Sequence, residues 1–416
     1  MSTNVDFELY SQLISDYGSP LYVYELNDVS LRIQELRERL TEESQIYYSL
    51  KSNPLPSIVQ HVADNGCRLE VTSENELNVA CDTGIPKHRI LYGGPGKTPD
   101  ELRYALERGV THFSVESWVD LQRINSLAHK NDSGIRILLR INPEAAIHNG
   151  LSMSGAKTQF GFEEKVLLDG WSNLSELHSN VSVIGFHIYY GTQMKDSEAI
   201  AKAAAVAIES VGKLCDETGF VPEVINLGGG FPWAYAQPQQ ESNLTDLKPA
   251  LNAALASFKY GSDVQLWFES GRYLSASSGT LVSTVLDIKE SKDSSRFVVL
   301  DAGINTLGGM SGLGRIPRGY MFIATDPSAD IASDTSTFEA SIVGPLCSPL
   351  DCMSRKHKLP ASLKAGDLVI IPNVGAYGIT ASLIAFLTRP PALEVSLLNG
   401  SFKALHQLRH GHQSLG

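Results

Sequence analysis

Lys51 and His187 lie near the ends of two strongly apolar segments, Y-Y-S-L-K-S-N and G-F-H-I-Y-Y-G-T-Q. A lysine at the end of a buried strand is unfavourable unless it is paired or neutral, and desolvation lowers its pKa. A neutral amine can attack an aldehyde and form a Schiff base. The imidazole of His187 could stack on a flat cofactor ring or transfer a proton. The simpler alternatives are a surface lysine beyond the strand and a core histidine with satisfied nitrogens.

Two further motifs end later apolar segments, namely Gly228-Gly229-Gly230 and Glu269-Ser-Gly-Arg272. Three successive glycines expose backbone N–H groups and suit a phosphate cradle. Glu269 could face a protonated ring nitrogen, and Arg272 could bind a phosphate or a carboxylate. The alternative is an internal ion pair between these two side chains.

Cys347 and Tyr377 stand in glycine-bounded polar turns, G-P-L-C-S-P-L-D-C and N-V-G-A-Y-G. Cys347 could donate a proton or be a small buried hydrophobic residue. Tyr377 could reach a phosphate or simply cap a turn. Taken together, the amine, the ring-stacking imidazole, the phosphate cradle and the carboxylate fit pyridoxal 5′-phosphate, whose protonated ring is an electron sink.

The elements that must position these residues are a series of alternating strands and helices. We predict helices over 28–40, 74–83, 99–108 and 197–218, among others. We predict strands over 46–52, 68–73, 90–94, 112–117, 136–142, 183–190, 223–230 and 264–271. Polar residues follow almost every strand, which favours a closed (β/α)8 TIM barrel with its site at the carboxyl ends. An open doubly wound sheet is the alternative.

Beyond residue 272 the pattern changes to short β-like segments joined by turns, such as 281–288, 297–300, 341–344 and 368–372. We predict a pyridoxal-phosphate-binding barrel over 26–272. Residues 1–25 and 273–416 would form a mostly antiparallel β domain that contributes Cys347 and Tyr377, with 20–24 adding a strand to it.

Composition limits the partners and the compartment. The 416 residues include 34 Lys and Arg against 46 Asp and Glu, a net charge of −12, which disfavours nucleic acid and anionic membranes as partners. No apolar run approaches the roughly 18 residues of a membrane span, and no secretory signal begins the chain. Five cysteines without a C-x-x-C pair argue against disulfides and against a metal site, and for the cytoplasm.

Six ordered motifs give the chain a resemblance to the fold-type III pyridoxal-phosphate decarboxylases, which include the diaminopimelate and ornithine/lysine enzymes. The resemblance extends from about residue 20 to 398. It implies an alanine-racemase-like barrel with a β domain, and a homodimer with shared active sites. The motifs are Y-Y-S-L-K-S-N, F-H-I-Y-Y-G-T-Q, N-L-G-G-G-F, E-S-G-R-Y, G-P-L-C-x-x-x-D and G-A-Y-G.

The same resemblance assigns roles to residues. Lys51 would form the Schiff base, His187 would stack on the ring, and Cys347 from the other subunit would protonate the reacting carbon. Cofactor binding would involve, in addition, Thr192, Gly228, Gly229, Gly230, Glu269, Gly271, Arg272 and Tyr377. Substrate binding would involve Arg272, Arg315, Arg318, Tyr320, Asp351 and Tyr377.

Two departures from the family pattern bear on the substrate. Ser348 follows Cys347, where diaminopimelate decarboxylases have a glutamate and ornithine decarboxylases an aspartate. The usual Arg-Pro-x-x-Tyr after Asp301-Ala302-Gly303 is also replaced. These features resemble a secondary-metabolism branch that acts on carrier-linked amino acids or on citryl-type siderophore intermediates. The alternatives are a diaminopimelate, lysine or ornithine decarboxylase, then a racemase, then a non-enzymatic cofactor-binding barrel.

Overall fold

The computed structural model describes residues 6–128, 134–143, 151–152, 158–237, 244–261, 263–308 and 336–412. The chain divides into two compact units. We call the first the barrel unit (Ser30–Trp233 and Glu241–Leu274) and the second the β unit (Met1–Val29, Ala234–Gln240 and Ser275–Gly416). No sequence pattern indicated that Ala234–Gln240 would belong with the β unit. None of the described helices is long and apolar enough to cross a membrane.

The barrel unit contains eight parallel strands that close on themselves, with each strand paired to the next and β12 paired to β2. The predicted barrel is therefore confirmed, and the open sheet is wrong. The eight are β2 (Gln45–Ser49), β3 (Arg68–Val71), β4 (Ile90–Tyr92), β5 (His112–Val115), β6 (Ile135–Asn142), β9 (Val181–Ile188), β11 (Val224–Asn226) and β12 (Gln265–Ser270). Short strands β7 (Leu151–Ser152), β8 (Phe162–Glu163) and β10 (Gly191–Thr192) lie outside this ring.

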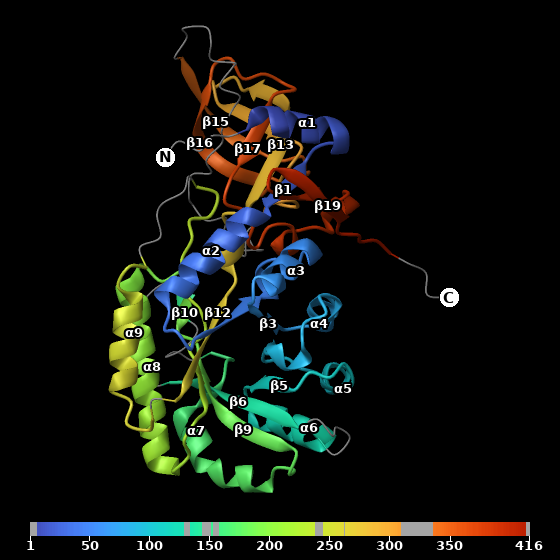
Figure 1. The fold of residues 1–416 in the computed structure, drawn as a ribbon. Helices are drawn as coiled ribbons and strands as arrows, with labels where there is room; N and C mark the ends of the chain where they lie inside the picture. The colour runs from blue at the N-terminus through green and yellow to red at the C-terminus, as the bar shows by residue number, and fades with distance from the viewer. Residues whose placement is uncertain are drawn as a thin grey trace. The chain divides into compact units, whose positions relative to one another are not determined.

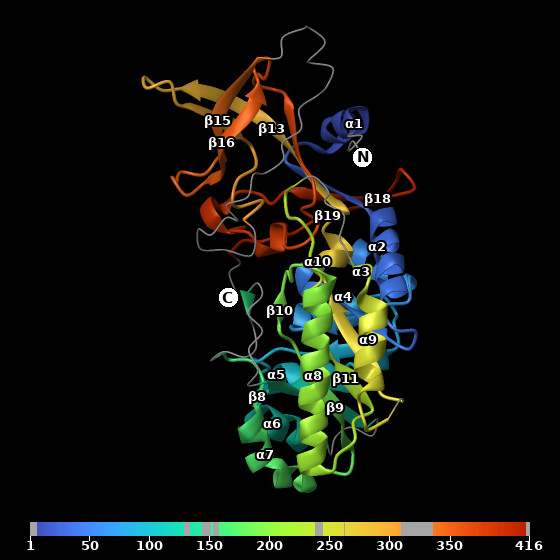
Figure 2. The ribbon, with the colours of Figure 1, turned by 90° about the vertical axis from the view of Figure 1, so that its left-hand side faces the viewer.

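Helices connect the barrel strands. Helix α8 has the predicted bounds because Asp196 accepts the N–H of Ala199 at its start and Gly219 adopts φ 70° after its end. Helices α8 and α9 lie side by side in both views (Figures 1 and 2). The longer helices are α2 (Leu26–Arg39), α3 (Pro56–Asp64), α4 (Glu74–Asp82), α5 (Pro99–Glu107), α6 (Trp118–Ala128), α7 (Glu164–Asp169), α8 (Ser197–Thr218) and α9 (Leu247–Ala256). The one-turn helix α10 (Arg272–Ser275) follows β12.

A layer of large side chains fills the interior of the barrel. Each of its six buried members comes from a different strand, which is how a closed parallel sheet forms a packed core rather than a pore. We call it the core layer, and its members are Tyr47, Leu91, Leu138, Ile184, Val224 and Trp267.

Among the described residues, the β unit is built on one eight-stranded sheet in which only the pairs β1–β18 and β14–β15 are parallel. The predicted, mostly antiparallel β domain is confirmed. Strand β1 pairs with β13 on one side and with β18 on the other, as the prediction for 20–24 expected. The strands are β1 (Leu21–Glu25), β13 (Gly279–Glu290), β14 (Arg296–Leu300), β15 (Thr337–Val343), β16 (Cys352–Pro360), β17 (Leu368–Ile371), β18 (Leu393–Leu398) and β19 (Ser401–Gln407).

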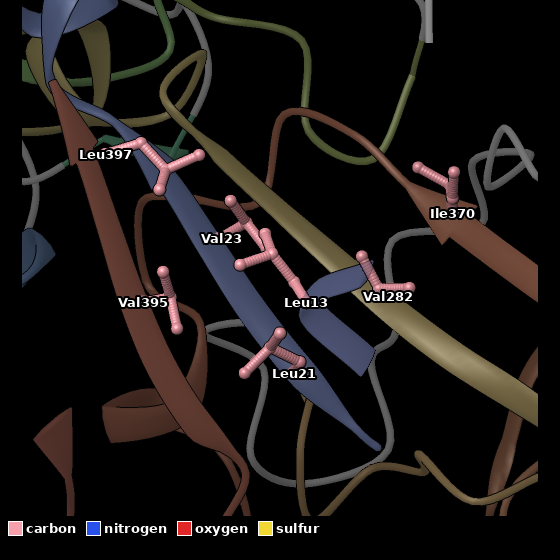
Figure 3. Close-up of a cluster of buried hydrophobic side chains, with 7 residues drawn as sticks. All are labelled: Leu13, Leu21, Val23, Val282, Ile370, Val395 and Leu397. Carbon is pink, nitrogen blue, oxygen red and sulfur yellow. The ribbon is translucent and has the colours of Figure 1, made fainter. Parts of the chain in front are cut away.

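One face of this sheet is covered by α1 (Phe7–Tyr17), which sequence reasoning missed. Figure 3 shows Leu13 of this helix among aliphatic side chains from four strands. The six strand residues are Leu21, Val23, Val282, Ile370, Val395 and Leu397, all buried.

Candidate active site at the carboxyl ends of the barrel strands

Lys51 lies on a 3₁₀ turn, η1 (Leu50–Ser52), because β2 ends at Ser49, three residues before the predicted end. Its side chain is 46% exposed, and Nζ lies 3.1 and 3.0 Å from the two carboxylate oxygens of Glu70. The expectation of a lysine desolvated inside the barrel is therefore wrong for this structure. Having left the strand, Lys51 is held as one half of an ion pair.

Glu70 was not among the predicted site residues. It lies in the middle of β3, and its side chain is only 4% exposed. An acidic residue inside a buried strand needs a cationic partner, so the R-L-E-V segment carried a usable signal. Glu70 positions the amine of Lys51 and supplies an acceptor for its proton.

His187 is buried near the end of β9. Its Nδ1 lies 2.8 Å from the hydroxyl of Ser114 on β5, and its Nε2 lies 3.5 Å from Oε1 of Glu269. Burial, followed by the nearby cation of Arg140, places the pKa of His187 well below its ordinary value. The imidazole is thus neutral, and its contact with Glu269 is not an ion pair.

Asn226 connects Glu269 to the glycine motif. It is fully buried at the end of β11, and its Nδ2 donates to Oε1 of Glu269 at 2.8 Å. Its Oδ1 accepts the N–H of Gly228 at 2.9 Å, and the N–H of Glu269 donates to the carbonyl of Gly228 at 2.7 Å. One amide therefore fixes both the carboxylate and the start of the loop. Sequence reasoning missed Asn226, although a polar residue ending an apolar strand was visible.

Close backbone approach explains the glycines of this loop. A Cβ at position 229 would lie 2.0 Å from the carbonyl oxygen of Glu269, and one at position 228 would lie 2.5 Å from the Tyr189 ring. Gly230 passes close to Gly191, beside Thr192 on β10. The loop can thus present its backbone N–H groups without side chains over them.

The residues after β12 complete the barrel part of the site. A Cβ at Gly271 would lie 2.7 Å from the Ser52 side chain, so this glycine lets β12 approach the turn that carries Lys51. Arg272 is the first residue of α10 and is half-buried. The structure therefore brings Lys51, His187, the glycine motif and Glu269 together at one end of the barrel.

In the β unit, Cys347 is exposed on the turn before β16. Asp351 is buried, and its two oxygens accept N–H groups of Ile304 (2.8 Å) and Leu346 (2.7 Å). Its carboxylate thus holds the turn that carries Cys347. Burial raises the pKa of Asp351 despite these two bonds.

Tyr377 has φ 52°, in the left-handed region that non-glycine residues seldom adopt. Its carbonyl accepts the hydroxyl of Tyr235 at 3.4 Å, within the β unit. Three other predicted substrate residues, Arg315, Arg318 and Tyr320, lie outside the described residues.

The barrel residues fit a phosphorylated aldehyde cofactor with a nitrogen heterocycle. The amine of Lys51 and the glycine loop lie at the carboxyl ends of the barrel strands. The carboxylate of Glu269, which Asn226 fixes, suits a protonated ring nitrogen. Among the described residues, the buried Nε2 of His187 has no hydrogen-bond partner, which suits an imidazole that stacks on a ring. The described residues include no cluster of three or more potential metal ligands.

A family comparison decides the identity of this site. Residues 26–276 match the model of the pyridoxal-dependent decarboxylases, pyridoxal binding domain. The chain belongs to this family. It is a pyridoxal-5′-phosphate-dependent carboxy-lyase, as the resemblance in its motifs implied.

Individual decarboxylases resemble it over nearly their whole length. An L-glutamyl-(BtrI acyl-carrier protein) decarboxylase of Niallia circulans is 30% identical, covering 97% of this chain and 94% of that one. A diaminopimelate decarboxylase of Zymomonas mobilis is 31% identical, covering 97% and 93%. The crystal structure of the Helicobacter pylori diaminopimelate decarboxylase with L-lysine is 27% identical, covers 95% of each chain and has a TM-score of 0.81.

Proposed function

We propose that this decarboxylase removes the α-carboxylate of a modified or carrier-linked amino acid in a secondary pathway such as antibiotic or siderophore assembly. The observation that carries the proposal is Ser348, beside Cys347. Its hydroxyl accepts the N–H of Leu350 at 3.2 Å and offers no charge for a distal ammonium group. The likeness to a decarboxylase of a carrier-bound glutamyl group supports this reading.

We assign the cofactor contacts to the barrel end. Lys51 would hold the cofactor through Nζ, after Glu70 accepts or shares its proton. Neutral His187 would stack on the ring, Glu269 would face the ring nitrogen, and the loop from Gly228 would bind phosphate with Thr192 and Arg272. Pyridoxal 5′-phosphate, when bound, supplies the electron sink for loss of carbon dioxide.

Product release requires a proton at the substrate α-carbon. We assign this proton to Cys347, whose thiol is exposed on a turn fixed by Asp351. As in the family pattern, Cys347 and Tyr377 would act across a homodimer on the partner's barrel. Asp351 is better suited to positioning this turn than to touching substrate, and its direct substrate contact remains a prediction.

A carbon dioxide release assay over three substrate groups tests the proposal. The groups are free basic amino acids including meso-diaminopimelate, citryl–diaminopropionate conjugates, and glutamyl carrier protein. We expect release from a conjugate or a carrier-bound substrate at a kcat/KM at least about tenfold above that for any free amino acid. A preference for free diaminopimelate, lysine or ornithine would contradict it.

That second outcome is a real alternative function, because the Zymomonas enzyme is as similar as the carrier-protein enzyme. The variant Ser348→Glu separates the two. If the position controls the distal group, the variant gains activity on diaminopimelate, whereas Ser401→Glu, at an exposed position of β19, serves as a control in the same unit.

A further inference from the structure

A cavity of about 790 Å³ lies at the amino ends of the barrel strands. Its lining includes Arg68 from β3, His112 from β5, Arg136 from β6 and Gln265 from β12, each at the first or second position of its strand. Because all eight strands are parallel, this end of the barrel is opposite the end that carries Lys51 and Glu269.

Two of the six members of the core layer, Val224 and Trp267, line this cavity, and Glu269 of the decarboxylase site lies two residues beyond Trp267 on β12. Trp267 belongs both to the layer and to the cavity lining. The Arg68 guanidinium lies 5.3 Å from the Trp267 ring centre and 5.6 Å from that of Tyr47. The His112 ring centre lies 5.9 Å from that of Trp267. A planar cation and an imidazole are thus held against an apolar wall.

Arg68 is fixed in place by neutral acceptors. Its Nε donates to Oε1 of Gln45 at 3.2 Å, and its Nη1 donates to the hydroxyl of Tyr47 at 3.1 Å. Within the described ranges it has no carboxylate partner, unlike Arg136, which pairs with Glu223 at 2.5 Å. The charge of Arg68 is therefore not neutralised by the residues around it.

Cations dominate the surroundings of His112. Its pKa is lowered to about 4 by burial first, and then by Arg136, Arg68 and His88. A positive potential at this spot is notable in a chain of net charge −12. An anion placed there would relieve the repulsion among these groups.

The remaining titratable groups of the lining are Glu223, Asp263 and Tyr260. Glu223 and Asp263 are exposed to solvent, and the Tyr260 hydroxyl donates to Asp216. Glu223 is already paired with Arg136. These groups therefore leave the part of the cavity beside half-buried Arg68 and buried His112 positive.

We propose that this cavity binds a small oxyanion, a phosphate or a carboxylate, with the Arg68 guanidinium as its principal ligand and His112 beside it. A guanidinium held by its own hydrogen bonds loses little conformational freedom when it binds a planar or tetrahedral oxyanion. The site is distinct from the phosphate cradle at the other end of the barrel.

Calorimetric titration of the holoenzyme with inorganic phosphate and, separately, with succinate tests the proposal. Ionic strength is kept constant with chloride, and the bound cofactor fills the glycine cradle. We expect a dissociation constant of about 1 mM or tighter for at least one of the two anions. Binding of phosphate alone or of succinate alone identifies the oxyanion class, and failure of both overturns the proposal.

Histidine NMR gives a second readout on the unaltered protein. An anion bound beside His112 must raise the pKa of its imidazole toward the ordinary value. An anion that binds without moving the His112 titration is bound elsewhere, and that result also overturns the proposal.

Variants locate the site. Arg68→Gln should weaken anion affinity by about tenfold or more. Arg68→Lys should weaken it by less, because lysine keeps the positive charge and loses only the planar pair of guanidinium N–H donors. Arg103→Gln, on the exposed face of α5, removes the same charge from the same unit and should change nothing. Equal affinity in Arg68→Gln and the unaltered enzyme contradicts the assignment. If Arg68→Gln does not fold, Arg68→Lys and the His112 titration decide.

Discussion

At the scale of single residues, the site is organised by three short contacts that the motifs alone do not reveal. Glu70 holds Lys51, Ser114 holds His187, and Asn226 holds Glu269. Each partner comes from a different element from the residue it positions. The motif residues could be predicted because lysine, histidine and glutamate side chains can take part directly in cofactor chemistry. Their partners are ordinary polar residues that acquire a role only through strand register.

Replacing Lys51 with alanine should abolish turnover, by at least about a thousandfold, because the other lysine near these strand ends, Lys97, is itself buried and paired with Asp120 at 2.7 Å. The visible absorbance of the bound cofactor should change, and borohydride should no longer fix the cofactor to the chain. Lys213→Ala on the exposed face of α8 is the matched control. Full activity in Lys51→Ala would remove this residue from the mechanism.

Asn226→Asp should remove the hydrogen bond to Glu269 while keeping the size of the side chain at position 226. The variant replaces the amide donor with a second carboxylate at about the same position, and two close carboxylates raise the pKa of one of them. We expect cofactor affinity to fall by about tenfold or more. Activity should also be lost at a higher pH on the acid side than in the unaltered enzyme.

Equilibrium dialysis of the cofactor and a pH–rate profile measure these two effects. Asn252→Asp, on the exposed surface of α9, adds the same charge as a control. A fall in kcat without any shift of the acid limb would mean that Asn226 acts on folding alone.

For Cys347→Ala we expect the cofactor to remain bound while the rate of amine formation falls by about tenfold or more. The reason is that the thiol lies in the β unit, on a turn fixed by Asp351, apart from the cradle residues in sequence. Product analysis should show a larger share of aberrant product. An unchanged rate with clean amine would reassign the proton donor.

At the scale of elements, strand and helix periodicity predicted the barrel well. Helix α8 was placed to the residue because Asp196 and Gly219 mark its ends. Strand ends were predicted less accurately: β2 ends at Ser49, and Lys51 lies two residues later on a 3₁₀ turn instead of in the strand. Strand β16 was missed because its sequence, C-M-S-R-K-H-K-L-P, is charged and shows no clear alternation.

The pair Tyr24–Glu394, on β1 and β18, makes the β unit sensitive to pH. The Tyr24 hydroxyl donates to Oε1 of Glu394 at 3.0 Å, and burial raises the pKa of Glu394 to about 7. In the unfolded chain this carboxyl has its usual pKa of about 4.5. Stability therefore falls as pH rises from about 4.5 to about 7, since only the unfolded form ionises freely in that window.

Glu394→Gln should remove this dependence, because the amide oxygen still accepts from Tyr24 and never ionises. At pH 8 we expect the variant to be more stable by up to about 3 kcal/mol, with little difference at pH 4.5. Urea unfolding at the two pH values measures it. Glu339→Gln, exposed on β15, is the control, and equal stability of Glu394→Gln and the unaltered protein at pH 8 would contradict the pKa shift.

At the scale of the whole molecule, the two units should respond differently to cofactor removal. The assigned cofactor residues Lys51, His187 and Glu269 belong to the barrel unit. Binding to the folded form alone stabilises it by mass action, so apoenzyme should lose stability in the barrel transition.

Differential scanning calorimetry of holoenzyme and apoenzyme tests this, with Glu394→Gln at pH 8 as a marker for the β-unit transition. We expect cofactor loading to raise the barrel transition by several degrees and to leave the marked transition in place. One transition that responds to both changes would show that the units unfold together.

The sheet of the β unit takes its strands from both ends of the chain, and this order has a consequence for biosynthesis. Strand β1 leaves the ribosome early, but β13 and β18, which flank it, are translated only after the entire barrel. The barrel itself can close as soon as β12 reaches β2. A nascent chain whose residues up to Leu274 have emerged from the ribosome would therefore carry a closed barrel and an apolar segment, Leu21–Glu25, whose flanking strands are not yet exposed. Such chains should be held by a chaperone until the final strands are made.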